Sequence, residues 1–183
     1  MRFMRGFVLG VVAVVCGCVG SVNPVIDDRS ATFDPALLGT WSDSAGKERA
    51  VITQGAPRTY AIQYTDDAGE TVSFNGTLGR SGTRYILDVQ PTSAALGPYK
   101  DLVVRLHIPV ILDATSGRIH VATLDGDALD RFLRSNPGAV AHGRTSDGLV
   151  LTADTPGLER FFAGYLQRPG ALMTPSTWIR RSP

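Results

Sequence analysis

The sequence is poor in cysteine, with only Cys16 and Cys18, both near the N-terminus. Two cysteines that close together are badly placed to form a disulfide with each other, and no other thiol is available to either of them. We therefore expect the body of the chain to fold without a disulfide and to work without a thiol nucleophile.

An excess of charge of one sign is also missing. The chain carries 18 Lys and Arg residues against 17 Asp and Glu residues, which gives a formal net charge of +1. The basic residues are scattered, with Arg180 and Arg181 as the densest pair, and the aromatic residues fall at expected core positions instead of between them. This pattern argues against a nucleic-acid-binding surface.

Histidine is scarce, and no familiar catalytic motif is present. His107 and His120 fall on neighbouring expected strands but about 13 Å apart along them, too far to share a metal ion. We therefore interpret them as solvated surface histidines. The segment 142–147 contains a His, a Ser and an Asp, but nucleophilic triads are assembled from separate elements, so we interpret it as a polar loop. We predict no metal site, no cofactor and no catalytic residue.

Only one long uncharged run occurs, and it lies at the N-terminus. Arg2 and Arg5 precede the stretch 6–18, which is apolar but contains glycines and is shorter than the about 20 residues of a membrane-spanning helix. A basic start followed by a short apolar run is typical of a secretory signal peptide. We predict that residues 1–17 form this signal.

The end of that run, Val15-Cys16-Gly17-Cys18, resembles the lipobox of bacterial lipoproteins. In that family an aliphatic residue, a small residue and Gly or Ala precede the cysteine that is lipidated and becomes the first residue. The resemblance implies that Cys18 is lipidated and that the protein is anchored to a membrane of the cell envelope. Val19 stands where Asp commonly signals inner-membrane retention, which favours the outer membrane.

The next stretch, residues 18–33, is polar after its first residues, has no periodicity and contains Pro24. We interpret it as the lipidated N-terminus followed by a flexible tether. Residues 34–183 are then expected to form a single β-rich domain.

Turn signals recur about every ten residues in this domain, with alternating apolar residues between them. The pattern predicts an α+β fold: an antiparallel curved sheet or partial β-barrel of about nine strands. The even positions from Leu102 to Leu112 are apolar, which predicts a long strand with an even core face, and we expect Leu112 to pair with Ile119. Two helices, 128–135 and one capped by Thr155 that ends near Leu166, are inserted in the C-terminal half.

The sequence Gly39-Thr40-Trp41 on the first expected strand, followed by the meander to Leu124, resembles the lipocalins and lipocalin-like bacterial lipoproteins. This resemblance implies a barrel with an apolar interior, and a late basic residue, Arg180 or Arg181, over the Trp41 ring. Gly39, Trp41, Trp178 and Arg180 are the implied structural residues. Lipocalins carry their helix after the last barrel strand, whereas this chain places helices before its final strands.

Several aromatic and aliphatic residues are expected on one apolar side of the sheet, and we predict that they bind a ligand. These candidates are Tyr60, Tyr64, Phe74, Tyr85, Leu106 and Ile108. Buried tyrosine hydroxyls need a partner, which favours a pocket, whereas Phe132, Phe161 and Phe162 would fill the pocket if they packed into it. The sequence thus favours a carrier of a small apolar or lipid-like molecule. The alternatives are an envelope protein-interaction module with a filled core and an enzyme without a recognisable motif.

Overall fold

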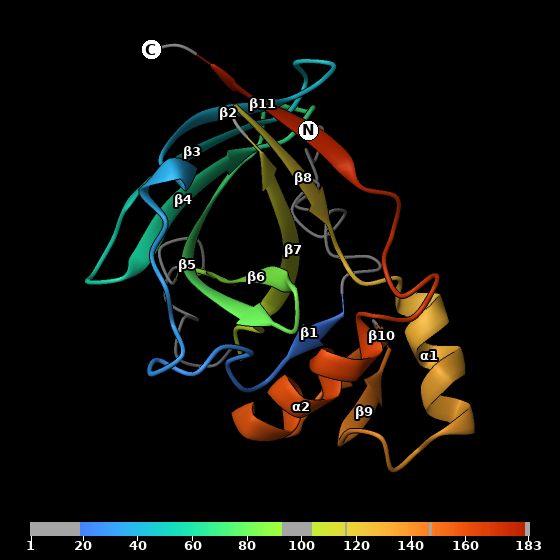
Figure 1. Cartoon of the computed structure of the whole chain (residues 1–183). Helices are drawn as coiled ribbons and strands as arrows, with labels where there is room; N and C mark the ends of the chain where they lie inside the picture. Colours follow the sequence, from blue (N-terminus) through green and yellow to red (C-terminus); the bar gives the residue numbers. More distant parts are fainter. Residues whose placement is uncertain (1–18, 93–103, 116, 147, 182–183) are drawn as a thin grey trace, which may run out of the picture.

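The computed structural model describes residues 19–92, 104–115, 117–146 and 148–181, so Cys18 and the expected signal peptide lie outside the described residues. Eight antiparallel strands form a closed barrel, and two helices with a small sheet pack against it (Figure 1). The predicted α+β fold with two late helices is confirmed. The sheet closes completely, instead of remaining a partial barrel.

Figure 1 looks approximately along the barrel, so its strands form a ring around the interior. The order around the ring is β11-β2-β3-β4-β5-β6-β7-β8. The strands are β2 (Gly39–Asp43), β3 (Arg49–Gln54), β4 (Thr59–Thr65), β5 (Thr71–Ser81), β6 (Arg84–Pro91), β7 (Ile108–Thr115), β8 (Arg118–Ala122) and β11 (Ser176–Arg181). The last strand pairs with both β2 and β8, and this double pairing closes the barrel.

Alternation along each strand separates the barrel interior from its outer face. On β6, Leu87 and Val89 belong to the interior cluster, whereas Ile86 and Asp88, which alternate with them, point outward. The other buried members of the interior cluster come from every remaining strand or from the short 3-10 helix Pro35–Leu37: Leu37, Trp41, Ala50, Ile52, Tyr60, Ile62, Leu78, Leu112, Ile119 and Trp178.

The β7–β8 hairpin differs from the prediction by two residues. Leu112 pairs with Val121, not with Ile119, because β7 continues to Thr115 and turns tightly at Gly117, whose φ is 74°. A shift of two residues keeps every side chain on its predicted face. Residues 104–107 of the predicted run are not part of this strand, and Val104 is 69% exposed. The start of the run, at Leu102, lies outside the described residues.

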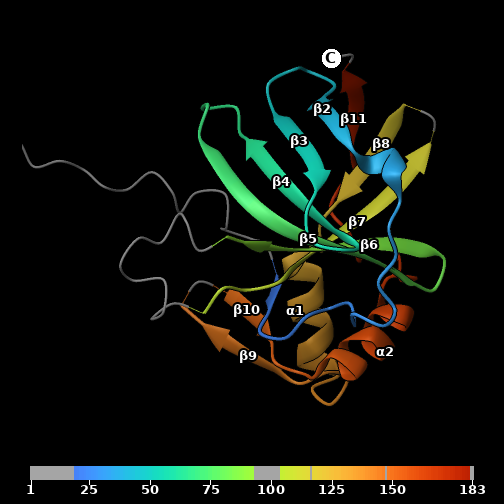
Figure 2. The same cartoon turned by 90° about the vertical axis from the view of Figure 1, so that its left-hand side faces the viewer.

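A second layer covers one side of the barrel, below it in Figures 1 and 2. It consists of β1 (Gly20–Ser21), β9 (His142–Thr145), β10 (Gly148–Leu151), α1 (Gly126–Ser135) and α2 (Thr155–Tyr165). The three strands form a sheet in the order β1-β10-β9, so the predicted polar loop over 142–147 is in part a strand. Buried residues of both helices pack with Ile86 and Ile111 from the outer face of the barrel, making a second hydrophobic core.

Both helices are capped by an aspartate that precedes their first residue. The Asp125 carboxylate accepts a hydrogen bond from the Ala128 amide at 2.8 Å, and the Asp154 carboxylate accepts one from Gly157 at 2.9 Å. Such caps satisfy amides that have no partner inside the helix. The predicted cap of α2, Thr155, is instead its first residue, and its hydroxyl donates to the Pro24 carbonyl at 2.7 Å.

The segment predicted as a flexible tether is instead packed against the barrel. Val25 and Ile26 are 1% and 3% exposed, and the Val25 amide donates to the buried Asp88 carboxylate at 2.8 Å. Ile26 lies directly on Gly79 of β5, where an added Cβ would be 2.6 Å from the Ile26 side chain. The polar residues suggested a tether, but most of its apolar residues are buried.

Within the described part of the chain, none of the helices combines the length and apolar character needed to cross a membrane.

Candidate functional site: the barrel cavity

The barrel encloses a cavity of about 360 Å³. Most of the 22 lining residues are aliphatic or aromatic, and they include Tyr60, Tyr64, Phe74 and Ile108 from the predicted ligand-binding set. The helix aromatics do not fill it, because Phe161 and Phe162 belong to the second core outside the barrel. Phe161 instead stacks on Tyr165, with ring centroids 5.1 Å apart.

One end of the cavity is closed by Trp41. Its ring is 2% exposed, and its indole nitrogen donates to the Leu37 carbonyl at 2.9 Å. The Arg180 guanidinium lies over the ring, 4.6 Å from its centroid, and donates to the Leu38 carbonyl at 2.7 Å and to the Ala36 carbonyl. The structure therefore has the arrangement of basic residue and tryptophan that the lipocalin resemblance implied.

Gly39 makes this arrangement possible. Its φ is 127°, a backbone conformation that residues with a side chain rarely adopt, and an added Cβ would lie 3.0 Å from an Arg180 guanidinium nitrogen. The glycine thus allows the arginine to cross the first barrel strand and reach the Trp41 ring.

Tyr60 also lies near the closed end, and its hydroxyl already has partners. The hydroxyl accepts a hydrogen bond from the Asp34 amide at 2.7 Å and donates to the Asp34 carbonyl at 3.2 Å. Burial raises the pKa of this hydroxyl, and Phe33 stacks on the ring at 4.9 Å. The expectation that a buried Tyr60 would need water or a ligand is therefore wrong, because the backbone satisfies it.

The other end of the cavity is the mouth, where lining residues become exposed. Met173 is 52% exposed there, and Tyr64 and Glu48 are half-buried. Burial raises the pKa of the Tyr64 hydroxyl, and the charge of the Glu48 carboxylate and a hydrogen bond with it raise the pKa further. The Tyr64 ring lies 6.2 Å from that of Trp178, tilted by 43°.

Two predicted ligand-binding residues lie elsewhere. Tyr85 is 37% exposed near the β5–β6 hairpin and has the Arg80 guanidinium over its ring at 5.1 Å. Leu106 packs against β1, where an added Cβ on Gly20 would be 2.8 Å from its side chain. Both were assigned to the interior by alternation alone, which does not say where a strand leaves the barrel.

A buried polar network that the sequence analysis missed lies on the outer face of β6. Asp88 is 4% exposed, and its carboxylate lies 3.1 Å from Nδ1 of His107, while Gln90 lies 3.0 Å from Nε2 of the same ring. His107 is therefore a structural residue between the two layers instead of the solvated histidine we expected. An aspartate between the apolar residues Leu87 and Val89 was the available signal.

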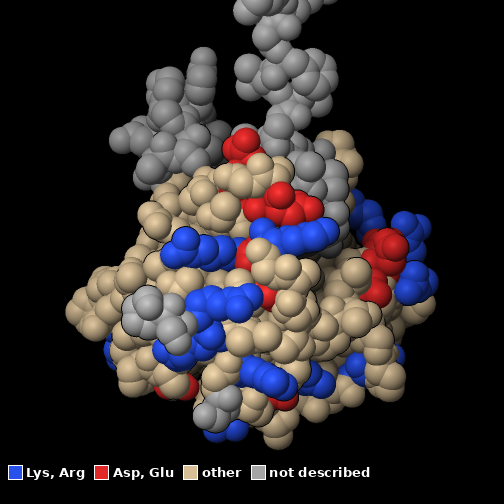
Figure 3. All heavy atoms as spheres, turned by 90° about the horizontal axis from the view of Figure 1, so that it is seen from above, with Lys and Arg blue, Asp and Glu red and all other residues tan. Residues whose placement is uncertain are grey.

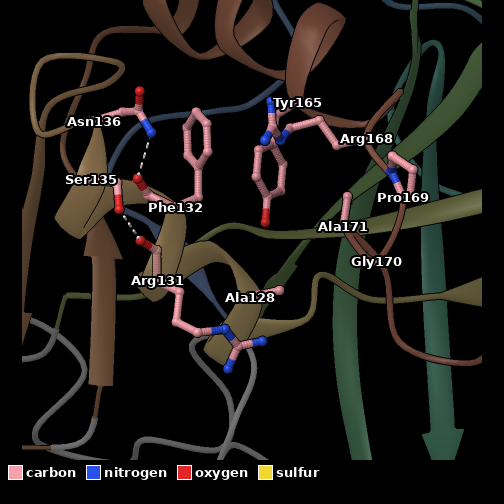
Figure 4. A pocket seen from close by; sticks show the side chains of 10 residues that line it. All are labelled: Ala128, Arg131, Phe132, Ser135, Asn136, Tyr165, Arg168, Pro169, Gly170 and Ala171. Carbon is pink, nitrogen blue, oxygen red and sulfur yellow. Dashed lines mark hydrogen bonds between the residues drawn. The ribbon is translucent and has the colours of Figure 1, made fainter.

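A second hollow, of about 300 Å³, lies between α1 and the chain after α2 (Figure 4). Arg131, Arg168 and Tyr165 line it, and the Arg168 guanidinium lies 4.6 Å from the centroid of the Phe132 ring. The hollow is near the C-terminal ends of both helices, where the helix dipole stabilises cations. The arginines thus have a structural role there, which makes this hollow a poorer candidate site than the barrel.

The described ranges contain no metal centre. No group of three or more His, Cys, Asp or Glu residues in these ranges is placed to hold a metal ion. On the face in Figure 3, basic and acidic side chains are intermixed, which agrees with the near-zero net charge.

No protein-family model, curated protein or solved structure matches this chain. The function has to be argued from the barrel cavity itself.

Proposed function

We propose that this protein is a lipoprotein of the bacterial cell envelope whose barrel binds a small apolar or lipid-like molecule. The observation that carries the binding role is the interior cavity of about 360 Å³, lined mainly by apolar side chains. Cavities of about 300 to 1,000 Å³ with apolar walls and a few polar groups are typical of small-molecule sites.

The arrangement of the two cores supports this role. In a protein that used its barrel only as a scaffold, the large helix aromatics would be the natural filling for the interior. Here Phe132, Phe161 and Phe162 pack with one another and with Tyr165 in the second layer. The barrel interior therefore remains available to a ligand.

The proposed location in the cell envelope rests on the N-terminal sequence. The signal-like run and the lipobox-like Val15-Cys16-Gly17-Cys18 support export and lipidation at Cys18, and Val19 favours the outer membrane over the inner membrane. A membrane-anchored carrier would meet lipid-like ligands at the membrane surface.

The test of binding is titration with an uncharged, environment-sensitive apolar fluorophore. Val110→Trp places a large side chain in the cavity, because Val110 lines it, and should abolish saturable binding. Val121→Trp, another lining position, repeats the test if the first variant does not fold. Val51→Trp is the matched control, because Val51 alternates with the interior residues Ala50 and Ile52 and so points outward.

Saturable binding by the parent and the control, lost in the folded cavity variants, is the expected result. Absence of binding in folded protein from which copurified lipid has been removed would overturn the carrier role and favour a protein-interaction module.

A further inference from the structure

Among the residues that the structure describes, a single charged group lines the barrel cavity. Glu48 lies at the mouth, and the described lining includes no Lys, Arg or His. No ion pair forms between Glu48 and a basic residue among the described residues. Lys47 and Arg49, its neighbours in the sequence, are both exposed and do not line the cavity.

Other acidic groups act on the same mouth. Like the Glu48 carboxylate, the carboxylates of Asp66 and Asp67, in the β4–β5 hairpin, are close enough to Tyr64 to raise the pKa of its hydroxyl. The mouth of the cavity is therefore negative. A ligand carboxylate that entered it would meet like charge, with no basic group among the described lining residues to compensate, which costs free energy.

Aromatic rings complete the mouth. Tyr64, whose pKa the nearby Glu48 carboxylate raises, and Trp178 both line the cavity and lie in ring contact. A carboxylate beside aromatic rings is the combination that recognises ammonium groups, since the ring faces attract cations and the carboxylate supplies the opposite charge.

Building on the proposed carrier function, we propose that the ligand is an amphipathic cation. Its apolar body occupies the barrel, and an ammonium head lies at the mouth against Glu48, Tyr64 and Trp178. The chemistry of this mouth therefore selects against fatty acids, which place a carboxylate at the end of an apolar chain.

The protein supplies its own reporter for the test. Trp41 and Trp178 are the only two tryptophans of the chain, and both line the cavity, Trp41 at the closed end and Trp178 in ring contact with Tyr64. Intrinsic fluorescence of the full chain is followed during titration with octyltrimethylammonium, octanoate and octanol. These short-chain probes share the apolar body and differ in the charge of the head.

We expect octyltrimethylammonium to bind at least about tenfold more tightly than octanoate, with octanol between them, because the head groups differ in their Coulomb energy with Glu48. Glu48→Gln should bring the three dissociation constants to within about threefold of one another, and Glu48→Lys should reverse their order. Glu70→Gln is the matched control, because Glu70 is an exposed acid of the same β4–β5 hairpin that does not line the cavity.

The two proposals fail in different ways. If octanol binds, and octanoate binds as tightly as the cation or more tightly, the proposed head group is wrong and the carrier function still stands. A cation preference that survives in Glu48→Gln also overturns the proposed head group. Failure of all three probes to bind overturns the carrier function itself.

Discussion

Arg180 and Trp41 are direct partners in the ladder between the last and first barrel strands, and the guanidinium lies 4.6 Å from the centroid of the indole ring. The contact joins residues from the two ends of the domain at the seam where the barrel closes. The hydrogen bonds that the Arg180 guanidinium donates to the Ala36 and Leu38 carbonyls also hold the 3-10 helix next to the closed end of the cavity.

Trp41→Ala is expected to destabilise the protein by about 3 to 5 kcal/mol, because it removes a large, almost fully buried aromatic side chain. Arg180→Gln should lower the free energy of unfolding by less than Trp41→Ala does. A double-mutant cycle that combines Arg180→Gln with Trp41→Phe should give a coupling free energy of about 0.5 to 2 kcal/mol. Urea unfolding of the parent, of Trp41→Ala and of the three variants of the cycle provides the values. A Trp41→Ala protein as stable as its parent would remove the structural role given to the Gly39-Thr40-Trp41 motif.

The N-terminal segment should contribute to stability. Ile26→Ala is expected to cost about 2 to 4 kcal/mol, because Ile26 is 3% exposed and lies against Gly79. The control Val22→Ala, at a residue 43% exposed in the same segment, should change stability by less than about 0.5 kcal/mol. If thermal unfolding gave equal and negligible shifts for both variants, the segment would be a tether after all.

Stability should fall at alkaline pH. The pKa values of Tyr60, Tyr64 and Tyr165 are raised in the folded protein, chiefly by burial, above the value of about 10 expected for an unfolded chain. Below that value both states keep the phenolic protons and the contribution is fully present. As the pH rises above about 10 the unfolded state loses protons first, and the contribution is lost.

Tyr64→Phe should therefore reduce the alkaline slope of the urea midpoint. Tyr85→Phe, at the exposed tyrosine, is the control that should leave the slope unchanged. A slope identical in parent and Tyr64→Phe would mean that the folded environment of Tyr64 differs from the one described.

Lipidation is tested at Cys18. Radiolabelled palmitate should enter the parent protein and not Cys18→Ala, and the variant should lose stable membrane association because its acyl chains are absent. Cys16→Ala is the control and should still be labelled. Label in the Cys18→Ala protein, or none in the parent, would refute the lipoprotein proposal.

The sequence predicted the parts of this protein that depend on periodicity. Strands such as β4, with Tyr60, Ile62 and Tyr64 on one side, have their face fixed by alternation, so the interior was largely foreseen. Helix ends were close to prediction because Asp125 and Pro156 are local signals.

What depends on contacts distant in the sequence was missed. The burial of Val25 and Ile26 depends on the outer face of a barrel whose closure no local pattern indicates. The same holds for Glu48, whose position at the mouth follows from the pairing of β3 with β4 and from the place where the barrel ends. Tyr85 and Leu106 were wrongly assigned to the interior because alternation gives the side of the sheet on which a residue lies, and not its position along the barrel.

The packing of the first described residues has a consequence for how the molecule would sit on a bilayer. Val19 is 4% exposed, and the next two residues form β1, which pairs with β10 and bridges to His107. If Cys18 carries the acyl chains, the linker between the lipidated residue and the folded domain is about one residue long, or roughly 4 Å. The domain would then have little freedom to tumble, and the location of β1 would decide which surface of the molecule rests on the headgroups.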